Sequence, residues 1–237
     1  MIALIPARLG SKRVPRKNFR ALGGQPLWWW SAKAALDSGL FARVVVSTDG
    51  FSYFPLSYFP RQCDGANILI HTRKPNHATD TAHDYEWVSD VMAEHPGYDL
   101  FAILRPTSPF RTASTIRRAY AQLIASGAHS IRAVQPVREH PGKMWRVLDG
   151  MRMEPYHQPV RWQGGAPVHS QPTQGLDPVY VQNASLEMAW CWVLDRTRSI
   201  AGTVICPLLT DPVEGSDINT EHDWAEAERL AGIHLHA

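Results

Sequence analysis

The chain has 237 residues, of which 44% are hydrophobic, as expected for one large α/β domain with a substantial core. Its 24 basic and 22 acidic side chains leave a formal net charge of +2, which is too balanced for general nucleic-acid binding. No apolar stretch approaches the roughly 20 residues that cross a bilayer, and the amino end lacks the pattern of a signal peptide. Three cysteines without metal-ligand spacing favour a reduced, cytoplasmic protein. We expect neither a membrane nor a nucleic acid as its partner.

Apolar runs alternate with helical patterns through the first half of the chain. The expected strands are 1–5, 43–48, 100–104 and 130–134, and the expected helices are 27–38, 81–94 and 112–126. Buried β-branched strands that alternate with helices of this length predict a mostly parallel, twisted sheet with helices on both faces, a Rossmann-like α/β fold. In such sheets, ligands bind beyond the carboxyl ends of the strands.

Residues 139–178 differ from the rest of the chain, since Pro, Gly, Gln, His and Trp dominate and no long helical period is visible. Trp145, Tyr156 and Trp162 are unusual in disordered segments. We therefore favour an irregular or β-rich dimerisation arm, which packs on a partner subunit, over a disordered insertion. The whole chain, 1–237, is then a single domain with this arm inserted.

The sequence returns to a core-like composition after the expected arm. The core-like stretches are 179–194 and 203–206, and they are followed by an expected last helix over 222–231 that Asn219 or Thr220 caps. A near repeat, Ser-Tyr-Phe-Pro at 52–55 and again at 57–60, has no functional interpretation.

A basic loop at 5–18 follows the first expected strand. It holds one glycine and five cations, and no acid occurs in the first twenty residues. Backbone N–H groups at a turn, together with Arg and Lys side chains, are suited to phosphate oxygens. The loop matches neither a Walker P-loop nor a dinucleotide fingerprint. Two prolines fix its course, which favours a defined site for a small polyanion over a solvated basic loop.

Two other segments follow expected strands and so belong to the same edge of the sheet. They are Thr48-Asp49 and Arg105-Pro106-Thr107-Ser108. Because the carboxyl ends of parallel strands share one edge, these segments and the basic loop should converge on one crevice.

The basic loop resembles the opening motif of the cytidylyltransferases that activate nine-carbon acidic sugars, the CMP-sialic acid synthetase family. Three later segments agree in order and spacing: 73–81 resembles the family's Arg-Pro loop, 104–111 its Gln-Pro-Thr-Ser-Pro-Leu-Arg loop, and 216–223 its Asp-Ile-Asp-Thr metal motif. The resemblance spans nearly the whole chain. It implies a nucleotidyltransferase that joins CTP to a nonulosonate sugar acid and releases pyrophosphate.

The resemblance also implies roles for residues at matching positions. The nucleotide contacts would be Arg8, Ser11, Lys12, Lys17, Asn18, Arg73 and Thr81. The sugar contacts would be Arg105, Thr107, Ser108, Arg111, Lys143 and Asn183. Arg8 and Lys17 would grip the leaving pyrophosphate and, with Asp217, form the catalytic set. For Arg13 and Arg16, contact with phosphate and simple exposure to solvent both remain open.

A triphosphate substrate implies a divalent cation, usually Mg²⁺, held by one or two carboxylates and phosphate oxygens. Asp217 matches the first aspartate of the metal motif, and Asn219 replaces the second. We expect both to be metal ligands, with help from Asp223 or Asp49 left open. For Asp217 and Asp49, a turn-forming role is the alternative.

Three alternatives to the leading function remain. An eight-carbon keto-deoxy-octulosonate cytidylyltransferase or another sugar nucleotidyltransferase would differ in acceptor. A non-catalytic nucleotide-binding relative would agree with the missing second aspartate. Arg105 stands where the family has glutamine, so the identity of the nonulosonate is open. The arm and the family precedent both predict a homodimer.

Overall fold

The computed structural model describes residues 1–50, 68–156 and 167–235. The Ser-Tyr-Phe-Pro repeat, Cys63 and Trp162 lie outside these ranges. The chain divides into two compact units. The larger unit joins Met1–Ala133 to Asn183–Ala237, and the smaller unit is Val134–Gln182, which contains the segment expected to form an arm.

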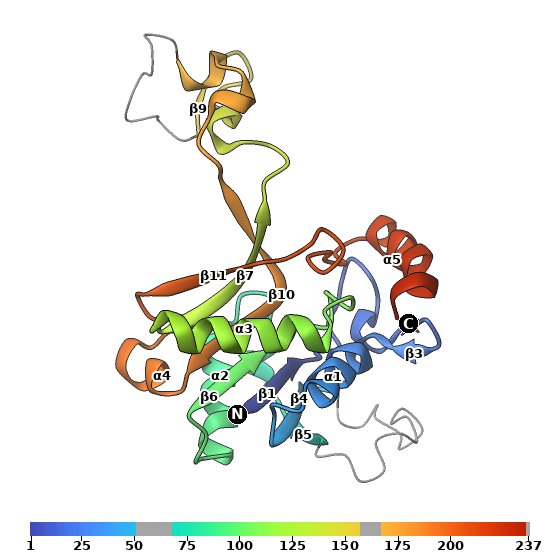
Figure 1. Ribbon diagram of the computed structural model, residues 1–237. Coiled ribbons are helices and arrows are strands. Elements are labelled where there is room, and N and C mark those ends of the chain that lie inside the picture. Colours follow the sequence, from blue (N-terminus) through green and yellow to red (C-terminus); the bar gives the residue numbers. More distant parts are fainter. Residues whose placement is uncertain (51–67, 157–166, 236–237) are drawn as a thin grey trace. The chain divides into compact units, whose positions relative to one another are not determined.

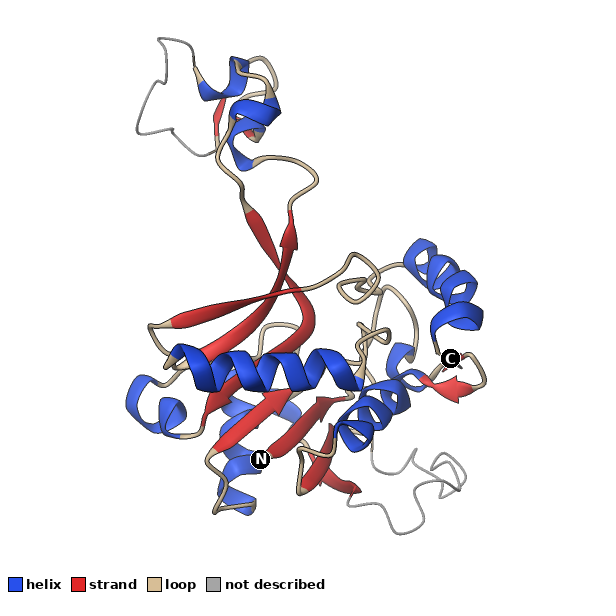
Figure 2. Ribbon diagram, viewed as in Figure 1, coloured by secondary structure: helices blue, strands red, loops and turns tan. Residues whose placement is uncertain are grey.

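A seven-stranded sheet forms the centre of the fold, in the order β11-β7-β10-β6-β1-β4-β5 (Figure 2). Its strands are β1 (Ile2–Pro6), β4 (Arg43–Thr48), β5 (Ile68–Thr72), β6 (Leu100–Ile103), β7 (Ser130–Pro136), β10 (Tyr180–Trp190) and β11 (Ile205–Leu209). Strand β1 runs parallel to β4 and β6, and β4 runs parallel to β5. Strand β10 is antiparallel to β6. The predicted mostly parallel α/β sheet is confirmed.

Helices cover both faces of this sheet (Figure 1). They are α1 (Leu27–Ser38), α2 (Asp84–Glu94), α3 (Ala113–Ser126), α4 (Trp192–Thr197) and α5 (Glu221–His234). Successive residues of a strand point to opposite faces, so β1 contributes to two cores. Ala3 and Ile5 pack in the cluster that contains α1 and α3, whereas Ile2 and Leu4 pack with Trp87 of α2.

Local sequence signals set the ends of several helices. Thr112 caps α3 and Thr220 caps α5, each in a reciprocal capping box with the residue three positions later. Helix α1 ends at Gly39 with φ of 69°, a left-handed conformation that suits glycine. The predicted helix at 81–94 begins three residues late, at Asp84, so Thr81 lies in the preceding loop.

Two short elements connect β1 to α1. The strands β2 (Ala21–Leu22) and β3 (Gln25–Pro26) form a hairpin whose turn uses Gly23 and Gly24, both at positive φ. The 3₁₀ turn η1 (Lys17–Phe19) follows Arg16, whose φ of 51° is unusual for a residue with a side chain. This turn buries Lys17 and Asn18.

The smaller unit is irregular, as its composition predicted. It contains the hairpin β8 (Trp145–Val147) and β9 (Met153–Pro155) and the 3₁₀ turns η6 (Pro141–Lys143), η7 (Val168–Ser170) and η8 (Thr173–Gly175). A further 3₁₀ turn, η5 (Pro75–His77), follows β5 in the larger unit. Over the residues that the structure describes, no helix is both long and apolar enough to span a bilayer.

Candidate active site

A cavity of about 580 Å³ lies within the larger unit, where several parallel strands end. Pro6 ends β1, Arg73 follows β5 and Arg105 follows β6, and all three line the cavity. Six cations contribute to its walls: Arg8, Lys12, Arg13, Lys17, Arg73 and Arg105. The cavity also contains two carboxylates, Asp80 and Asp84, so its charge favours an anionic ligand. The expected convergence of the strand-end loops is therefore present.

The basic loop contacts Asp80, which lies far from it in sequence. Arg8 Nη2 lies 2.8 Å from Asp80 Oδ1, and Lys12 Nζ lies 2.7 Å from Asp80 Oδ2. Hydrogen bonds from Lys12 and Arg8 lower the pKa of Asp80, so its carboxylate remains charged. Asp80 thus pairs with two of the cations that we assigned to phosphate binding and offsets part of their charge.

Asp49 supports the basic loop from the end of β4. Its Oδ1 accepts a hydrogen bond from the Leu9 backbone N–H at 2.8 Å. The next residue, Gly50, lies so close to Leu9 that an added Cβ would approach the leucine side chain to 2.5 Å. Asp49 therefore anchors the basic loop to the end of β4 and does not line the cavity.

Lys17 and Asn18 hold the two ends of the site together. Lys17 Nζ donates to the backbone carbonyl of Ile218, and Asn18 Nδ2 donates to the carbonyl of Arg8 at 2.9 Å. Burial lowers the pKa of Lys17, the Asp217 carboxylate opposes that shift, and the charges of Arg13 and Arg8 lower the pKa further. The lysine still lines the cavity, so its ammonium can face a ligand.

Arg73 is a buried member of the cavity wall, with 6% of its surface exposed. Its guanidinium stacks on the ring of Trp87 at 4.4 Å from the centroid. Burial lowers the pKa of Arg73 to about 10, although the carboxylates of Asp84 and Asp49 oppose this shift. A cation fixed in this way is ready to donate to a ligand with little loss of side-chain freedom.

Arg105 is bracketed by two carboxylates. Its Nη2 lies 2.5 Å from Asp84 Oδ2 and 2.6 Å from Glu187 Oε1. Glu187, in β10, also pairs with Arg132 of β7 at 2.9 Å. Burial opposes the charge on Arg105, but Glu187 and Asp84 more than compensate and raise its pKa. Arg105 therefore offers directed N–H groups without adding net charge to the pocket.

Four residues of the larger unit that were predicted at the sugar or nucleotide site do not line the cavity: Arg111, Ser108, Thr81 and Asn183. Arg111 is 3% exposed, and its guanidinium donates to the carbonyls of Ser185 and Arg105 and to Ser31 Oγ. Ser108 is fully buried, and Thr81 is exposed but lies outside the cavity lining. All three of these acceptors are the protein's own oxygens, which favours a structural role for Arg111.

The other predicted sugar contacts have different surroundings. Thr107 lines the cavity, and its carbonyl accepts a hydrogen bond from the Ile218 N–H at 2.8 Å. Asn183 Nδ2 donates to Thr210 Oγ1 at 2.9 Å, away from the lining residues. Lys143 lies in the smaller unit, in η6. Ser11 lines the cavity beside Lys12, as the basic-loop prediction requires.

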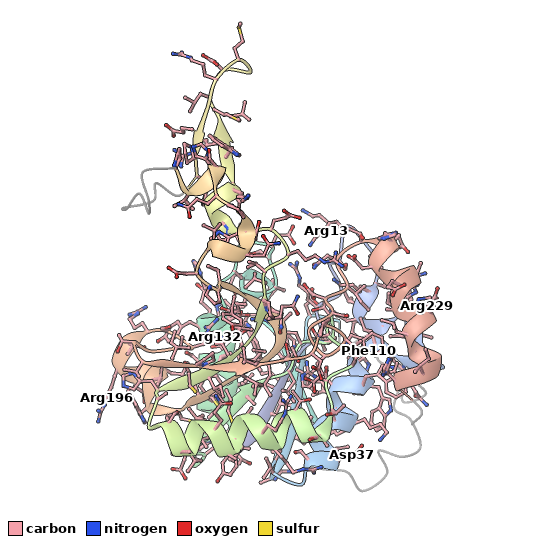
Figure 3. The ribbon with its side chains drawn as sticks, turned by 45° about the horizontal axis from the view of Figure 1, so that its top comes forward. Arg13, Asp37, Phe110, Arg132, Arg196 and Arg229 are labelled. Carbon is pink, nitrogen blue, oxygen red and sulfur yellow. The ribbon has the colours of Figure 1, made fainter. Side chains whose placement is uncertain are left out.

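The expected metal ligands lie next to each other before α5. Asn219 Nδ2 donates to Asp217 Oδ2 at 2.5 Å. Asn219 Oδ1 accepts at 3.1 Å from Nη2 of Arg13, a residue labelled in Figure 3. Asp217 Oδ1 is buried and has no hydrogen-bond partner among the described residues. Asp223 accepts hydrogen bonds from Asn219 and Thr220 as part of the helix cap, which occupies it.

Four residues at the site were missed by sequence reasoning. They are Asp80, Asp84, Trp87 and Glu187. Asp84 and Trp87 are three apart at the start of a helix, a spacing that places both on one face, and this signal was available. Asp80 lay within a motif already singled out at 73–81. Glu187 gave no local signal, since it stands alone in an apolar strand.

Comparisons with known proteins agree with this geometry. The sequence profile of a family described as "Cytidylyltransferase" matches residues 2–145. The chain is 32% identical to the CMP-N,N'-diacetyllegionaminic acid synthase of Legionella pneumophila, over 100% of this chain and 98% of that protein. It is also 32% identical to an N-acylneuraminate cytidylyltransferase of Streptococcus agalactiae, over 62% of this chain and 35% of that protein.

Solved structures show the same fold at low sequence identity. A CMP:2-keto-3-deoxy-manno-octonic acid synthetase complexed with CTP superposes with a TM-score of 0.64 at 14% identity, covering 98% of each chain. The 2-C-methyl-D-erythritol 4-phosphate cytidylyltransferase of Thermus thermophilus superposes with a TM-score of 0.61 at 16% identity, also covering 98% of each chain. The chain therefore belongs to the cytidylyltransferase family, in the group that contains the CMP-sialic acid synthetases.

Proposed function

We propose that this protein joins CTP to a nine-carbon 2-keto-3-deoxy sugar acid and forms the CMP-sugar and pyrophosphate. One observation carries the proposal: Arg8, Lys12 and Lys17 line one cavity at the strand ends, in a chain matched throughout by a CMP-legionaminic acid synthase. A cavity with six cations and two acids suits a triphosphate.

The reaction is an in-line displacement at the α-phosphorus of CTP. The anomeric hydroxyl of the sugar acid forms the new P–O bond, its proton is released, and the bond to the bridging oxygen of pyrophosphate breaks. Negative charge grows on the bridging and pyrophosphate oxygens, so catalysis depends on positioning and on nearby cations. Arg8 supplies a bidentate fork, and Lys17 supplies a point charge that follows the leaving group.

Lys17 has a second task in this proposal. Its bond to the Ile218 carbonyl connects the basic loop to the segment that holds Asp217 and Asn219. Thr107 bonds the same residue through the Ile218 N–H at 2.8 Å. Ile218 thus links the predicted phosphate clamp to the loop that carries Thr107 and Arg105, which supports a single crevice for both substrates.

We propose Mg²⁺ as the cofactor, which would neutralise the triphosphate and polarise its oxygens when bound. Asp217 fits, because its buried Oδ1 lacks a hydrogen-bond partner among the described residues and can serve as a carboxylate ligand. Asn219 fits less well as it lies, because its Oδ1 already accepts from Arg13. We therefore propose a site with one carboxylate from this segment, Asp217.

On the acceptor side, the charge of Arg105 is compensated by Asp84 and Glu187. Its guanidinium is then suited to hydroxyl or amide groups of the sugar rather than to its carboxylate. We propose Thr107 as a second hydroxyl contact. We propose Lys143 as the contact for the acceptor carboxylate, as the resemblance implies. The three hydrogen bonds of Arg111 to the protein's own oxygens support the choice of Lys143 over Arg111.

We also propose a cytoplasmic homodimer in which the 139–178 arm packs on the partner subunit. Large apolar side chains are exposed on the smaller unit, among them Val147 at 67%, Met151 at 94% and Met153 at 57%. Exposed apolar groups of this size favour a protein partner. Light scattering of the purified chain would measure its mass, and a monomeric mass would contradict this part of the proposal.

The function is tested by pyrophosphate release from CTP with a panel of acceptors. The panel contains N-acetylneuraminate, N,N'-diacetyllegionaminate, a pseudaminate derivative and the eight-carbon keto-deoxy-octulosonate, each with and without Mg²⁺. We expect Mg²⁺-dependent release with at least one nine-carbon acid, and the matching CMP-sugar by mass spectrometry. Release with the eight-carbon acid alone would favour the related octulosonate activity. CTP binding without pyrophosphate release in the presence of any acceptor would refute the proposed catalytic activity.

A further inference from the structure

Ser47 and His71 form a buried polar pair behind the cavity wall. They are register partners on the parallel strands β4 and β5, so their side chains lie on the same face of the sheet. Ser47 is fully buried and His71 is 3% exposed. The distance from Ser47 Oγ to His71 Nδ1 is 2.9 Å, which makes a hydrogen bond.

Arg73 completes a chain of hydrogen bonds from this pair to the cavity. Its Nε donates to Ser47 Oγ at 3.1 Å, and its Nη2 lies 3.5 Å from the Ser47 carbonyl oxygen. The guanidinium also stacks on the ring of Trp87. Ser47 and Trp87 together define the orientation in which Arg73 lines the cavity.

The direction of the hydrogen bonds follows from which groups can donate. Arginine has five N–H donors and no acceptor, so Ser47 Oγ must accept from Arg73. A serine oxygen has two acceptor lone pairs, so Ser47 can either donate its hydroxyl hydrogen to an unprotonated His71 Nδ1 or accept from a protonated one. The first arrangement gives a chain that runs from Arg73 to Ser47 to His71, with the histidine proton on Nε2.

The surroundings of the other ring nitrogen agree with this tautomer. His71 Nε2 lies 3.6 Å from Glu94 Oε1, so an Nε2 proton faces a carboxylate. Burial lowers the pKa of His71, which favours the neutral ring that the chain needs. Glu94 and Asp90 oppose that shift, and Arg73 and His95 reinforce it.

We propose that Ser47 and His71 are positioning residues for the nucleotide, which they influence by fixing the Arg73 guanidinium. Neither touches the ligand, and both act through Arg73. This inference rests on the proposed function, because Arg73 is placed at the nucleotide half of the cavity. A merely structural pair would affect folding stability and leave CTP affinity unchanged.

The test measures CTP dissociation constants by calorimetry, with kcat, KM and Tm, for three variants. Ser47→Ala removes the hydroxyl, His71→Leu removes the acceptor, and His71→Asn retains an acceptor oxygen near the position of Nδ1. Ser38→Ala is the matched control, since Ser38 is also buried and its hydroxyl donates to the Ala35 carbonyl in α1.

We expect Ser47→Ala, which removes a hydrogen bond to the charged Arg73, to weaken CTP binding about tenfold. His71→Leu removes only a neutral bond to Ser47 and should weaken CTP binding about threefold, and kcat should change little in both variants. His71→Asn should recover most of the affinity, and Ser38→Ala should bind CTP like the wild type. Unchanged CTP affinity in Ser47→Ala and His71→Leu would overturn the proposal, as would equal losses in the asparagine and leucine variants.

Nitrogen-15 NMR of the wild-type imidazole gives a readout that does not depend on variants or on turnover. We expect His71 to be neutral, with its proton on Nε2, at neutral pH. A proton on Nδ1, or a doubly protonated ring, would contradict the hydrogen-bond direction on which the proposal rests. If the wild-type protein binds no CTP, both the proposed function and the positioning role are wrong. The NMR experiment tests the hydrogen-bond chain independently of CTP binding.

Discussion

The variant Arg111→Lys tests whether Arg111 binds the sugar acid or stabilises the fold. The Arg111 guanidinium is buried and donates to three oxygens on separate elements: the Ser185 carbonyl in β10, the Arg105 carbonyl after β6, and Ser31 Oγ in α1. Burial and the neighbouring charge of Arg105 lower the pKa of Arg111, so a cation at this position is stable only while its hydrogen bonds are made. We expect the substitution to destabilise the fold and to leave the acceptor KM close to that of the wild type.

The size of the effect follows from the bonds that are lost. A lysine ammonium replaces a planar fork, and we expect it to keep one of the three bonds. At about 1.5–3 kcal/mol for each hydrogen bond to a charged group, the two lost bonds lower the unfolding free energy by about 3–6 kcal/mol. For a domain of this size, about 2–4 °C of Tm is lost per kcal/mol, so Tm should fall by at least about 6 °C.

The assay combines calorimetric Tm with steady-state kinetics for the sugar acid. Arg117→Lys is the matched control, because Arg117 donates to the carbonyls of Asp37 and Ser38 from an exposed position on α3. That variant should change Tm little. An unchanged Tm for Arg111→Lys, together with a raised KM for the acceptor, would refute this reasoning and restore Arg111 as the carboxylate contact.

Three further predictions concern the charges and caps around the cavity. Asp80→Asn should lower the KM for CTP, because the triphosphate then no longer competes with the Asp80 carboxylate for Arg8 and Lys12. The control Asp37→Asn breaks an ion pair of similar exposure and should leave this KM unchanged. A raised KM for Asp80→Asn would contradict the competition. Burial lowers the pKa of Lys17, so its ammonium loses its proton at a lower pH than that of an ordinary lysine. The kcat/KM for CTP should therefore decline early as the pH rises, and Lys17→Arg should abolish this decline. An identical pH profile for the two proteins would contradict the assignment of Lys17 to the phosphate clamp. Thr220→Ala should cost about 1 kcal/mol of stability through loss of the α5 cap, visible in urea unfolding, and an unchanged midpoint would contradict the capping box.

The sequence predicted the elements whose signals are local. The helix over 27–38 and the strand over 43–48 have the bounds that periodicity indicated. The cap of α5 was also predictable, because Thr220 stands three residues before Asp223. These features depend on residues within one or two turns of each other, so a single sequence is enough to find them.

The parts of the site that the sequence missed depend on distant contacts. Arg111 sits in a motif that resembles a ligand loop, but its role is decided by Ser31 and Ser185, which lie far from it in sequence. Asp80 meets Arg8 across seventy-two residues, and Glu187 meets Arg105 across eighty-two. Such pairings follow from strand order, which no local pattern specifies.

The most direct test of the central claim is pyrophosphate release from CTP by the wild-type protein with nine-carbon keto-sugar acids and Mg²⁺. The account predicts release that requires CTP, Mg²⁺ and one of these acids together, with one CMP-sugar formed for each pyrophosphate. It also predicts that no release occurs when the acid is left out. CTP binding without release under any of these conditions would contradict the proposed cytidylyltransferase activity.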